Sequence, residues 1–90
     1  MEIEFDPKKA ASNLKKHAVD FDEAASALLD SFAFVMDDPD ALGEQRLVLL
    51  GMSQQGRLLL ICYTFRGEVI RLISARCATK HEERGYAQGL

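Results

Sequence analysis

The chain of 90 residues contains no tryptophan and only two cysteines, two histidines and two prolines. Cys62 and Cys77 form no C-x-x-C pair, so the sequence predicts neither a disulfide framework nor a metal site. Apolar runs such as Leu58 to Tyr63 have only the length of a strand, far short of the roughly 20 residues that span a bilayer. The first residues lack the basic and apolar regions of a secretory signal, so we expect a cytoplasmic protein.

The chain also lacks the glycine-rich patterns that cradle phosphates, G-x-x-x-x-G-K-[ST] and G-x-G-x-x-G. The G-x-S-x-G turn that presents a nucleophilic serine is missing as well. These absences give no support for a P-loop hydrolase, a dinucleotide-binding enzyme or an α/β-hydrolase. We therefore expect no cofactor.

The composition, 48% hydrophobic and 28% charged, is typical of one folded domain spanning residues 1–90. The net charge of −3 argues against a non-specific nucleic-acid binder. The charge is uneven, because residues 1–45 carry four basic and eleven acidic side chains, whereas residues 46–90 carry seven basic and three acidic ones. An ordinary mixed surface and a local basic patch both remain open.

Two helices are predicted in the first third of the chain. The pair Asp6-Pro7 suits the N-cap and first position of a helix that reaches His17. Asp20 and Glu23 have the spacing of a capping box at the start of a second helix. Its apolar stripe comprises Phe21, Ala24, Ala25, Leu28, Leu29 and Phe32.

The rest of the chain favours strands. Expected strands are a short edge strand at residues 3–5, one at residues 33–36, and three β-rich segments at 46–52, 57–65 and 68–74. A Thr-x-x-Glu capping box predicts a last helix over residues 79–88. We expect an α+β domain in which the two N-terminal helices pack on an antiparallel β-meander, followed by a short C-terminal helix. The apolar run at residues 58–63 predicts a central strand covered on both faces.

Candidate site residues gather around the last strand and the last helix. Arg71 lies within an apolar strand, and Arg76 lies at the following junction, where helix N-terminal amides favour an anion. Glu82 and Tyr86 are four residues apart and share one helix face. Such a group could hold a phosphate and move a proton. Alternatively, Arg71 forms an ion pair in the sheet, Glu82 caps the helix and Tyr86 packs in the core.

The Lys16-His17 pair has the same two interpretations. His17 could act as an acid or base, but a histidine at a helix C-terminus also interacts favourably with the helix dipole.

Two strings of residues, in order over nearly the whole chain, resemble one protein family. The first string is Phe5-Asp6-Pro7, Lys9-Ala10, Asn13, Lys16-His17, Val19, Phe21 and Glu23-Ala24. The second is Arg46, Gly51, Ser53, Gly56 to Leu59, Tyr63-Thr64, Arg66-Gly67, Ile70-Arg71, Ile73 to Arg76, Ala78, Glu82 and Tyr86. This spacing is similar to that of BrnT-type toxins from bacterial type II toxin–antitoxin systems.

The resemblance implies a RelE-like fold and a ribonuclease that blocks translation. Because RNA carries its own nucleophile, the 2′-hydroxyl, we expect this cleavage to be metal-independent. The resemblance also implies a ribbon-helix-helix antitoxin, a toxin–antitoxin heterotetramer, and contact with DNA only through the antitoxin. The residues expected to act on RNA are Arg71, Arg76, Glu82, Tyr86 and His17 in catalysis, and Lys16, Lys80 and Arg84 in RNA binding. Within this set, the arginines would stabilise the phosphorane, with Glu82 as candidate base and His17 as candidate acid.

Several positions depart from the family pattern. Phe5 stands where tryptophan is common, Ala18 replaces a glycine, and Cys77 and His81 stand where the family is often rich in arginine. The lost positive charge favours an alternative, in which a catalytically weakened homologue acts as a binding module of an autorepressing complex. The uneven charge also suggests that the antitoxin binds across the acidic–basic boundary and covers the catalytic patch.

Overall fold

The computed structural model describes residues 1–89, in which three helices and five strands follow the predicted order. The elements are β1 (Ile3–Glu4), α1 (Pro7–His17), α2 (Phe21–Ala27), β2 (Phe34–Asp37), β3 (Leu47–Met52), β4 (Leu58–Arg66), β5 (Val69–Cys77) and α3 (Lys80–Gln88). Within residues 1–89, no helix combines the length and the apolar character that crossing a membrane requires.

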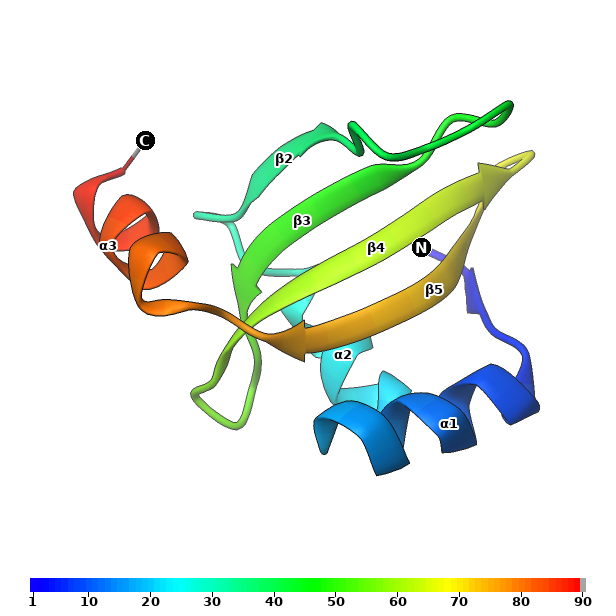
Figure 1. Cartoon of the computed structure of the whole chain (residues 1–90), viewed down its shortest axis with the longest axis horizontal. Helices are drawn as coiled ribbons and strands as arrows, with labels where there is room; N and C mark the ends of the chain where they lie inside the picture. Colours follow the sequence, from blue (N-terminus) through cyan, green and yellow to red (C-terminus); the bar gives the residue numbers. More distant parts are fainter. Residues whose placement is uncertain (90) are drawn as a thin grey trace.

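The five strands form one mixed sheet in the order β1-β5-β4-β3-β2 (Figure 1). Neighbours among β2, β3, β4 and β5 are antiparallel, so the predicted meander with β4 at its centre is confirmed. The expected edge strand is β1, which pairs with β5 in parallel over only two residues. A bulge in the β4–β5 ladder falls where Cys62 pairs with Ser74 and Tyr63 pairs with Leu72, leaving Ile73 without a partner.

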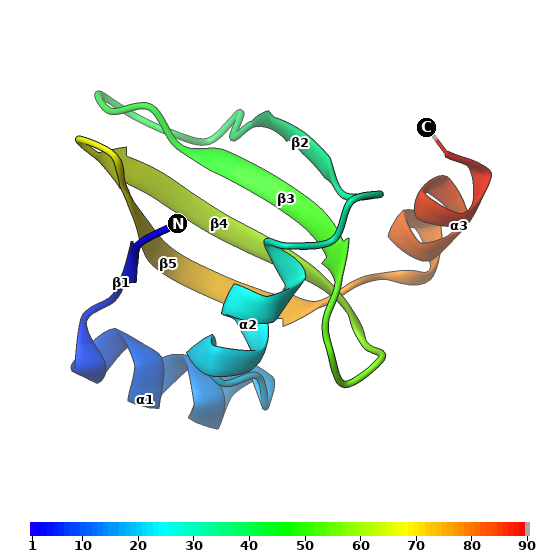
Figure 2. The same cartoon turned by 180° about the vertical axis from the view of Figure 1, so that it is seen from behind.

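Helices α1 and α2 lie on the same face of the sheet, as predicted (Figure 2). Where these helices meet the sheet, Phe21 of α2 and Leu59, Ile61 and Leu72 of the strands are almost fully buried. The residues of β4 between these core positions are only half-buried, because they face the side that the two helices leave open. The expectation that the apolar run 58–63 is covered on both faces is therefore wrong. The run is continuous because the open face is also apolar.

Helix α2 ends at Ala27 and is therefore shorter than its apolar stripe, which extends to Phe32, predicts. Leu29 and Phe32 are 68% and 76% exposed instead of facing the core. The Asp30 carboxylate accepts hydrogen bonds from the backbone N–H of Phe32 at 2.9 Å and of Met52 at 2.8 Å. These bonds turn the chain toward β3, and this tertiary contact outweighs the helical periodicity.

Helix α1 begins as predicted, with Asp6 as N-cap, but a polar residue occupies its buried position. Leu14 is half exposed, whereas Asn13 is buried. Its side-chain amide donates to the carbonyl of Ala75 at 2.8 Å and accepts from the Ala75 N–H at 3.0 Å, and it also donates to the Val19 carbonyl. Strand β1 pairs only with the first residues of β5. The Asn13 amide therefore provides the hydrogen-bond partners for the backbone groups of Ala75, which β1 does not reach.

Helix α1 is followed by its C-cap residue Ala18, which has φ 57° and ψ 32°. Its N–H bonds to the Leu14 carbonyl at 2.9 Å and closes the helix. A left-handed conformation brings the Cβ atom close to the backbone, so an alanine is strained where a glycine is not.

Replacing Ala18 by glycine should therefore stabilise the fold by about 1 kcal/mol, because relief of strain outweighs the entropy cost of glycine. Ala11→Gly, at an exposed position in the middle of the same helix, is the matched control and should destabilise by about 1 kcal/mol. Urea unfolding followed by circular dichroism measures both. Destabilisation by both substitutions would show that Ala18 is unstrained.

Candidate functional site

Arg76 and Glu82 form a two-pronged ion pair where β5 leads into α3. Arg76 Nη1 and Nη2 lie 2.9 and 3.0 Å from the two carboxylate oxygens of Glu82. Glu82 Oε1 also accepts a hydrogen bond of 2.8 Å from the Thr79 N–H, and Thr79 Oγ1 accepts from the Glu82 N–H. The predicted capping box is present, and the same carboxylate holds the guanidinium.

The charges of this pair stabilise each other. The hydrogen bond from Arg76 lowers the pKa of Glu82, and the Thr79 N–H lowers it further, although burial opposes both. The hydrogen bond to Glu82 in turn raises the pKa of Arg76. At neutral pH the site therefore holds a carboxylate and a guanidinium, whose side chains are 24% and 38% exposed and so reachable from solvent.

Tyr86, one helical turn beyond Glu82, connects α3 to the body of the protein. Its hydroxyl donates a hydrogen bond of 2.5 Å to Asp30 Oδ2, and its ring meets the Phe34 ring edge-on with centroids 6.4 Å apart. The bond to Asp30 is the main cause of the raised pKa of Tyr86. Burial works to raise the pKa of Asp30, but hydrogen bonds from Tyr86, Met52 and Phe32 outweigh it and lower that pKa.

Asp30 was missed by the sequence reasoning, which placed it inside an apolar helix. The available signal was the pair Asp30-Ser31, since an aspartate beside a serine is typical of a turn. Lys80 and Arg84 lie on one exposed side of α3, four residues apart, where both can reach a ligand in solution.

Arg71 lies away from this junction. Its Nη1 is 3.5 Å from Glu4 Oε1, and Arg66 Nε is 4.0 Å from the same oxygen. Arg71 lines a cavity of about 300 Å³ together with Arg46, Arg66 and Lys9. Its lining includes Phe65 and Arg66, which lead into the turn between β4 and β5. That turn lies at the opposite end of the sheet from α3 (Figure 1).

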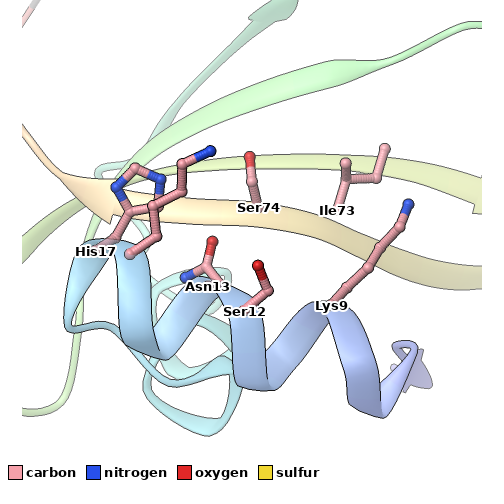
Figure 3. A pocket seen from close by; sticks show the side chains of 7 residues that line it. Lys9, Ser12, Asn13, His17, Ile73 and Ser74 are labelled. Carbon is pink, nitrogen blue, oxygen red and sulfur yellow. The ribbon is translucent and has the colours of Figure 1, made fainter.

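Lys16 and His17 line a separate pocket of about 240 Å³ between α1 and β5. Figure 3 shows Lys9, Ser12 and His17 extending from α1 beside Ser74 and Ile73 of β5. Ser74 is two residues before Arg76, which is about 7 Å along a strand. The structure thus brings Arg76, Glu82 and Tyr86 together at one end of the sheet. His17 and Lys16 lie beside the neighbouring stretch of β5. Arg71 lies at the far end of the sheet.

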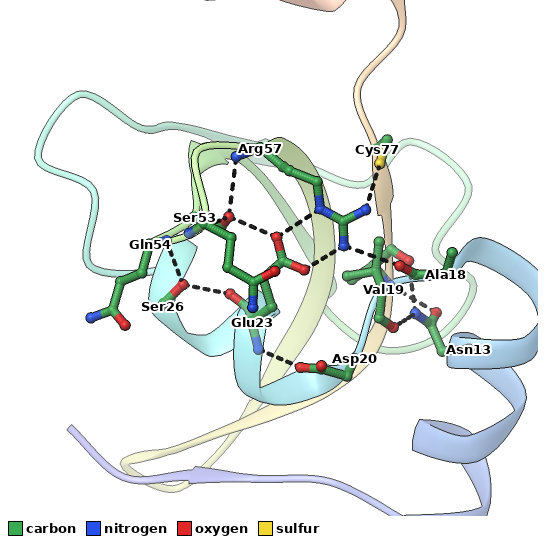
Figure 4. Close-up of polar contacts among 12 residues, drawn as sticks. Asn13, Ala18, Val19, Asp20, Glu23, Ser26, Ser53, Gln54, Arg57 and Cys77 are labelled. Carbon is green, nitrogen blue, oxygen red and sulfur yellow. Dashed lines mark hydrogen bonds and ion pairs between the residues drawn. The ribbon is translucent and has the colours of Figure 1, made fainter.

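Among the residues that the structure describes, Glu23 is the buried charged residue, and its carboxylate contacts Ser53 and Arg57 of the loop between β3 and β4 (Figure 4). Arg57 donates to both Glu23 oxygens, with Nε 2.9 Å from Oε2, and Ser53 Oγ donates to Oε2 at 2.7 Å. Arg57 Nη2 also donates to the Ala18 carbonyl at 3.0 Å. The expected capping box at Asp20 is therefore only half formed, because Arg57 draws the Glu23 carboxylate away from the helix start.

This network is structural. The hydrogen bond from Arg57 lowers the pKa of Glu23 against the effect of burial, and the Ser53 hydroxyl lowers it further. The contacts join α2 to the loop between β3 and β4 and to the end of α1. Within residues 1–89, no three histidine, cysteine or acidic side chains gather closely enough to hold a metal ion.

Comparison with known proteins places this fold in a class, the ribonuclease toxins of type II toxin–antitoxin systems. A family model described as "Ribonuclease toxin, BrnT, of type II toxin-antitoxin system" matches residues 5–82. The chain therefore belongs to the BrnT family, which confirms the family predicted from the sequence.

A solved structure agrees with the family match. The chain is similar to the ribonuclease toxin BrnT of Brucella abortus, known from a crystal structure at 1.1 Å resolution, with a TM-score of 0.69 and 25% sequence identity. The similarity covers 89% of this chain and 99% of the other. A comparison with curated protein sequences gives no match.

Replacing Arg57 by alanine leaves the Glu23 carboxylate buried without its cation and should cost about 3 kcal/mol of unfolding free energy. This is the low end of the usual range, because the Arg57 side chain is 37% exposed. The matched control is Arg46→Ala, whose side chain is equally exposed but whose partner Glu44 is 58% exposed, so less than about 1 kcal/mol should be lost.

The loss of unfolding free energy caused by Arg57→Ala should also depend on pH. The lowered pKa of Glu23 stabilises the wild type above the unfolded value of 4.5, and this contribution is lost as the pH falls through the folded pKa. The difference in stability between wild type and Arg57→Ala should be largest near pH 7 and narrow below about pH 4.5. Urea unfolding at a series of pH values measures it, and a difference independent of pH would contradict the role of the charge.

Proposed function

We propose that the chain cleaves RNA at the Arg76–Glu82 pair, needs no metal ion for this, and blocks translation in the cytoplasm. Membership of the BrnT family supports a toxin that acts on RNA. The observation that carries the choice of site is the two-pronged Arg76–Glu82 contact at the junction of β5 and α3. In this contact the Arg76 guanidinium, which can bind phosphate, lies next to the Glu82 carboxylate, which can accept a proton.

RNA brings its own nucleophile, the ribose 2′-hydroxyl, to this reaction. The 2′-hydroxyl loses its proton to a base, its oxygen bonds to phosphorus, and the bond from phosphorus to the 5′-oxygen breaks as that oxygen gains a proton. The products are a 2′,3′-cyclic phosphate and a 5′-hydroxyl. The protein has to supply a base, an acid and positive charge for the phosphorane, none of which requires a metal ion.

Arg76 stabilises the phosphorane, and Glu82 is the proposed base. A phosphate that binds to the Arg76 guanidinium competes with Glu82 for the same fork. Loss of that hydrogen bond moves the pKa of Glu82 back toward its ordinary value, because Arg76 is the main cause of its lowering. Substrate binding thereby turns an ion-paired carboxylate into a better proton acceptor.

The remaining predicted residues are assigned by position. His17 is the proposed acid and Lys16 a phosphate contact, since both line the pocket that includes Ser74 of β5. Tyr86 stacks on a base or assists proton transfer, while Lys80 and Arg84 contact RNA from the exposed side of α3. Because Arg71 lies at the far end of the sheet, we assign it to phosphate binding instead of catalysis.

The proposed partner is a ribbon-helix-helix antitoxin that forms a heterotetramer with the toxin and makes the DNA contacts of the complex. Strand positions that alternate with the core place apolar side chains on the open sheet face: Phe34, Met36, Val48, Leu58 and Leu60. Arg76 lies on the same face, opposite Leu60 in the register. A partner that covers this face buries apolar surface and occludes the proposed catalytic pair together.

A second candidate function is a toxin homologue weakened in catalysis that serves as a binding module of a repressor complex. The Arg76 fork is already occupied by Glu82, and Cys77 and His81 add no fixed positive charge nearby. RNA cleavage by the purified chain separates the two functions, because the binding module leaves RNA intact.

Glu82→Gln should lower the rate of RNA cleavage by about 10²- to 10⁴-fold, because glutamine cannot accept the proton. Glutamine still completes the capping box, so thermal unfolding should change little. The measurement is single-turnover cleavage of a short RNA in the presence of a chelator. Glu83→Gln, the adjacent exposed residue, is the matched control and should cleave like the wild type.

Two outcomes contradict this assignment. Cleavage by Glu82→Gln within threefold of the wild-type rate would exclude Glu82 as the base. Complete loss of wild-type cleavage on adding the chelator would contradict metal independence.

A further inference from the structure

Two cavities described above are adjacent along the seam between α1 and β5. Lys9 and Ile73 line both of them. One cavity continues to Lys16 and His17 at the end of α1, and the other continues to the arginines near the β4–β5 turn. From Lys9 to His17 the helix rises about 12 Å, so the seam is an elongated track and not a single spot.

Positive charge exceeds negative charge at the arginine end of this track. The basic residues Arg46, Arg66, Arg71 and Lys9 come from the segment before β3, from β4, from β5 and from α1. The acidic residues there are Asp6, Glu44 and the adjacent Glu4. Asp6 is also committed to the Lys8 N–H as the N-cap of α1, which leaves its carboxylate less able to neutralise a neighbour.

The pairing within this group is incomplete. Arg66 and Arg71 approach the same oxygen of Glu4, at 4.0 and 3.5 Å, so one carboxylate serves two guanidinium groups. Glu4 and Glu44 are 42% and 58% exposed, and water screens much of their attraction. Cations from four segments thus converge on a cavity of about 300 Å³ in a protein whose net charge is −3.

We propose that this seam is a binding track for the phosphate backbone of single-stranded RNA, with Lys9 at its centre and Arg46, Arg66 and Arg71 at its distal end. The proposal rests on the proposed function, since it supplies the path by which RNA extends from the catalytic pair. Ser74 lines the proximal end of the track, two residues before Arg76. The track binds RNA by charge and carries no sequence preference of its own.

The elongated shape favours a nucleic-acid strand over an acidic protein segment. A single carboxylate needs one cation, whereas a strand presents a phosphate at every nucleotide and suits cations spaced along a line. Guanidinium groups also bind phosphate with two parallel hydrogen bonds.

The test compares two lysines of α1, one that lines the track and one that does not. Lys9 and Lys15 are both exposed, but Lys15 is absent from the lining of both cavities. The probe is a 12-nucleotide 2′-O-methyl RNA, which the enzyme cannot cleave because its nucleophile is blocked. Fluorescence anisotropy measures its dissociation constant for each full-length variant over a series of salt concentrations.

Lys9→Gln should weaken binding about fourfold at 0.15 M salt and reduce the slope of log K against log salt by about 0.7, the loss of one single-strand phosphate contact. Lys9→Gln combined with Arg66→Gln should weaken binding about fifteenfold and reduce the slope by about 1.4. Lys15→Gln should bind within twofold of the wild type.

Equal weakening by Lys9→Gln and Lys15→Gln would overturn the track while RNA cleavage by the wild type still supports the proposed function. A wild type that neither binds the probe nor cleaves RNA would overturn both. If the double variant binds the probe like the wild type but associates more slowly with its antitoxin, the track recognises an acidic protein and the RNA assignment is wrong.

Discussion

The buried pair of Glu23 and Arg57 is the contact on which the arrangement of the other elements depends. A carboxylate with almost no solvent access is stable only while it is paired, so the pair fixes both the position of α2 and the path of the loop that carries Ser53. Arg57 also holds the carbonyl of Ala18, which sets the direction in which the chain leaves α1. The helical layer is thus fixed to one end of the sheet by charge and over its middle by apolar packing.

This arrangement separates the support of the fold from the surface available for chemistry. Both N-terminal helices cover one face, and the core beneath them is entirely apolar apart from the Glu23 network and Asn13. The opposite face is left to α3, which has no buried residue and is held by the edge-on contact of Tyr86 with Phe34 and by the polar contacts Arg76–Glu82 and Tyr86–Asp30. Polar contacts of this kind can exchange with water or a ligand at little cost, whereas the helical layer cannot.

Local signals in the sequence predict the elements well, and tertiary contacts explain the errors. Asp6-Pro7 and Thr79 mark helix starts because caps act within one turn. The end of α2 could not be predicted, since it depends on Asp30 meeting the Met52 N–H from 22 residues away in sequence. Residue spacing brings Glu82 to Arg76, and it also separates Arg71 from Arg76, because five residues of one extended strand span about 16 Å. Only the pairing of Arg71 with Glu4 depends on the tertiary position of β1. Glu23 and Arg57 occur in the family pattern, but their pairing becomes visible only in three dimensions.

The Asn13 amide has a consequence for association between copies of the chain. A sheet with one accessible edge can join only one other edge, so growth stops at a pair, whereas two accessible edges permit open-ended fibres. In the part of the chain that the structure describes, β2 is exposed along one edge and carries Val35 and Met36. On the other side, Asn13 occupies the backbone groups of Ala75 beyond the reach of β1. One side chain thereby blocks strand pairing at this stretch of the β5 edge, so the β2 edge is the more accessible of the two.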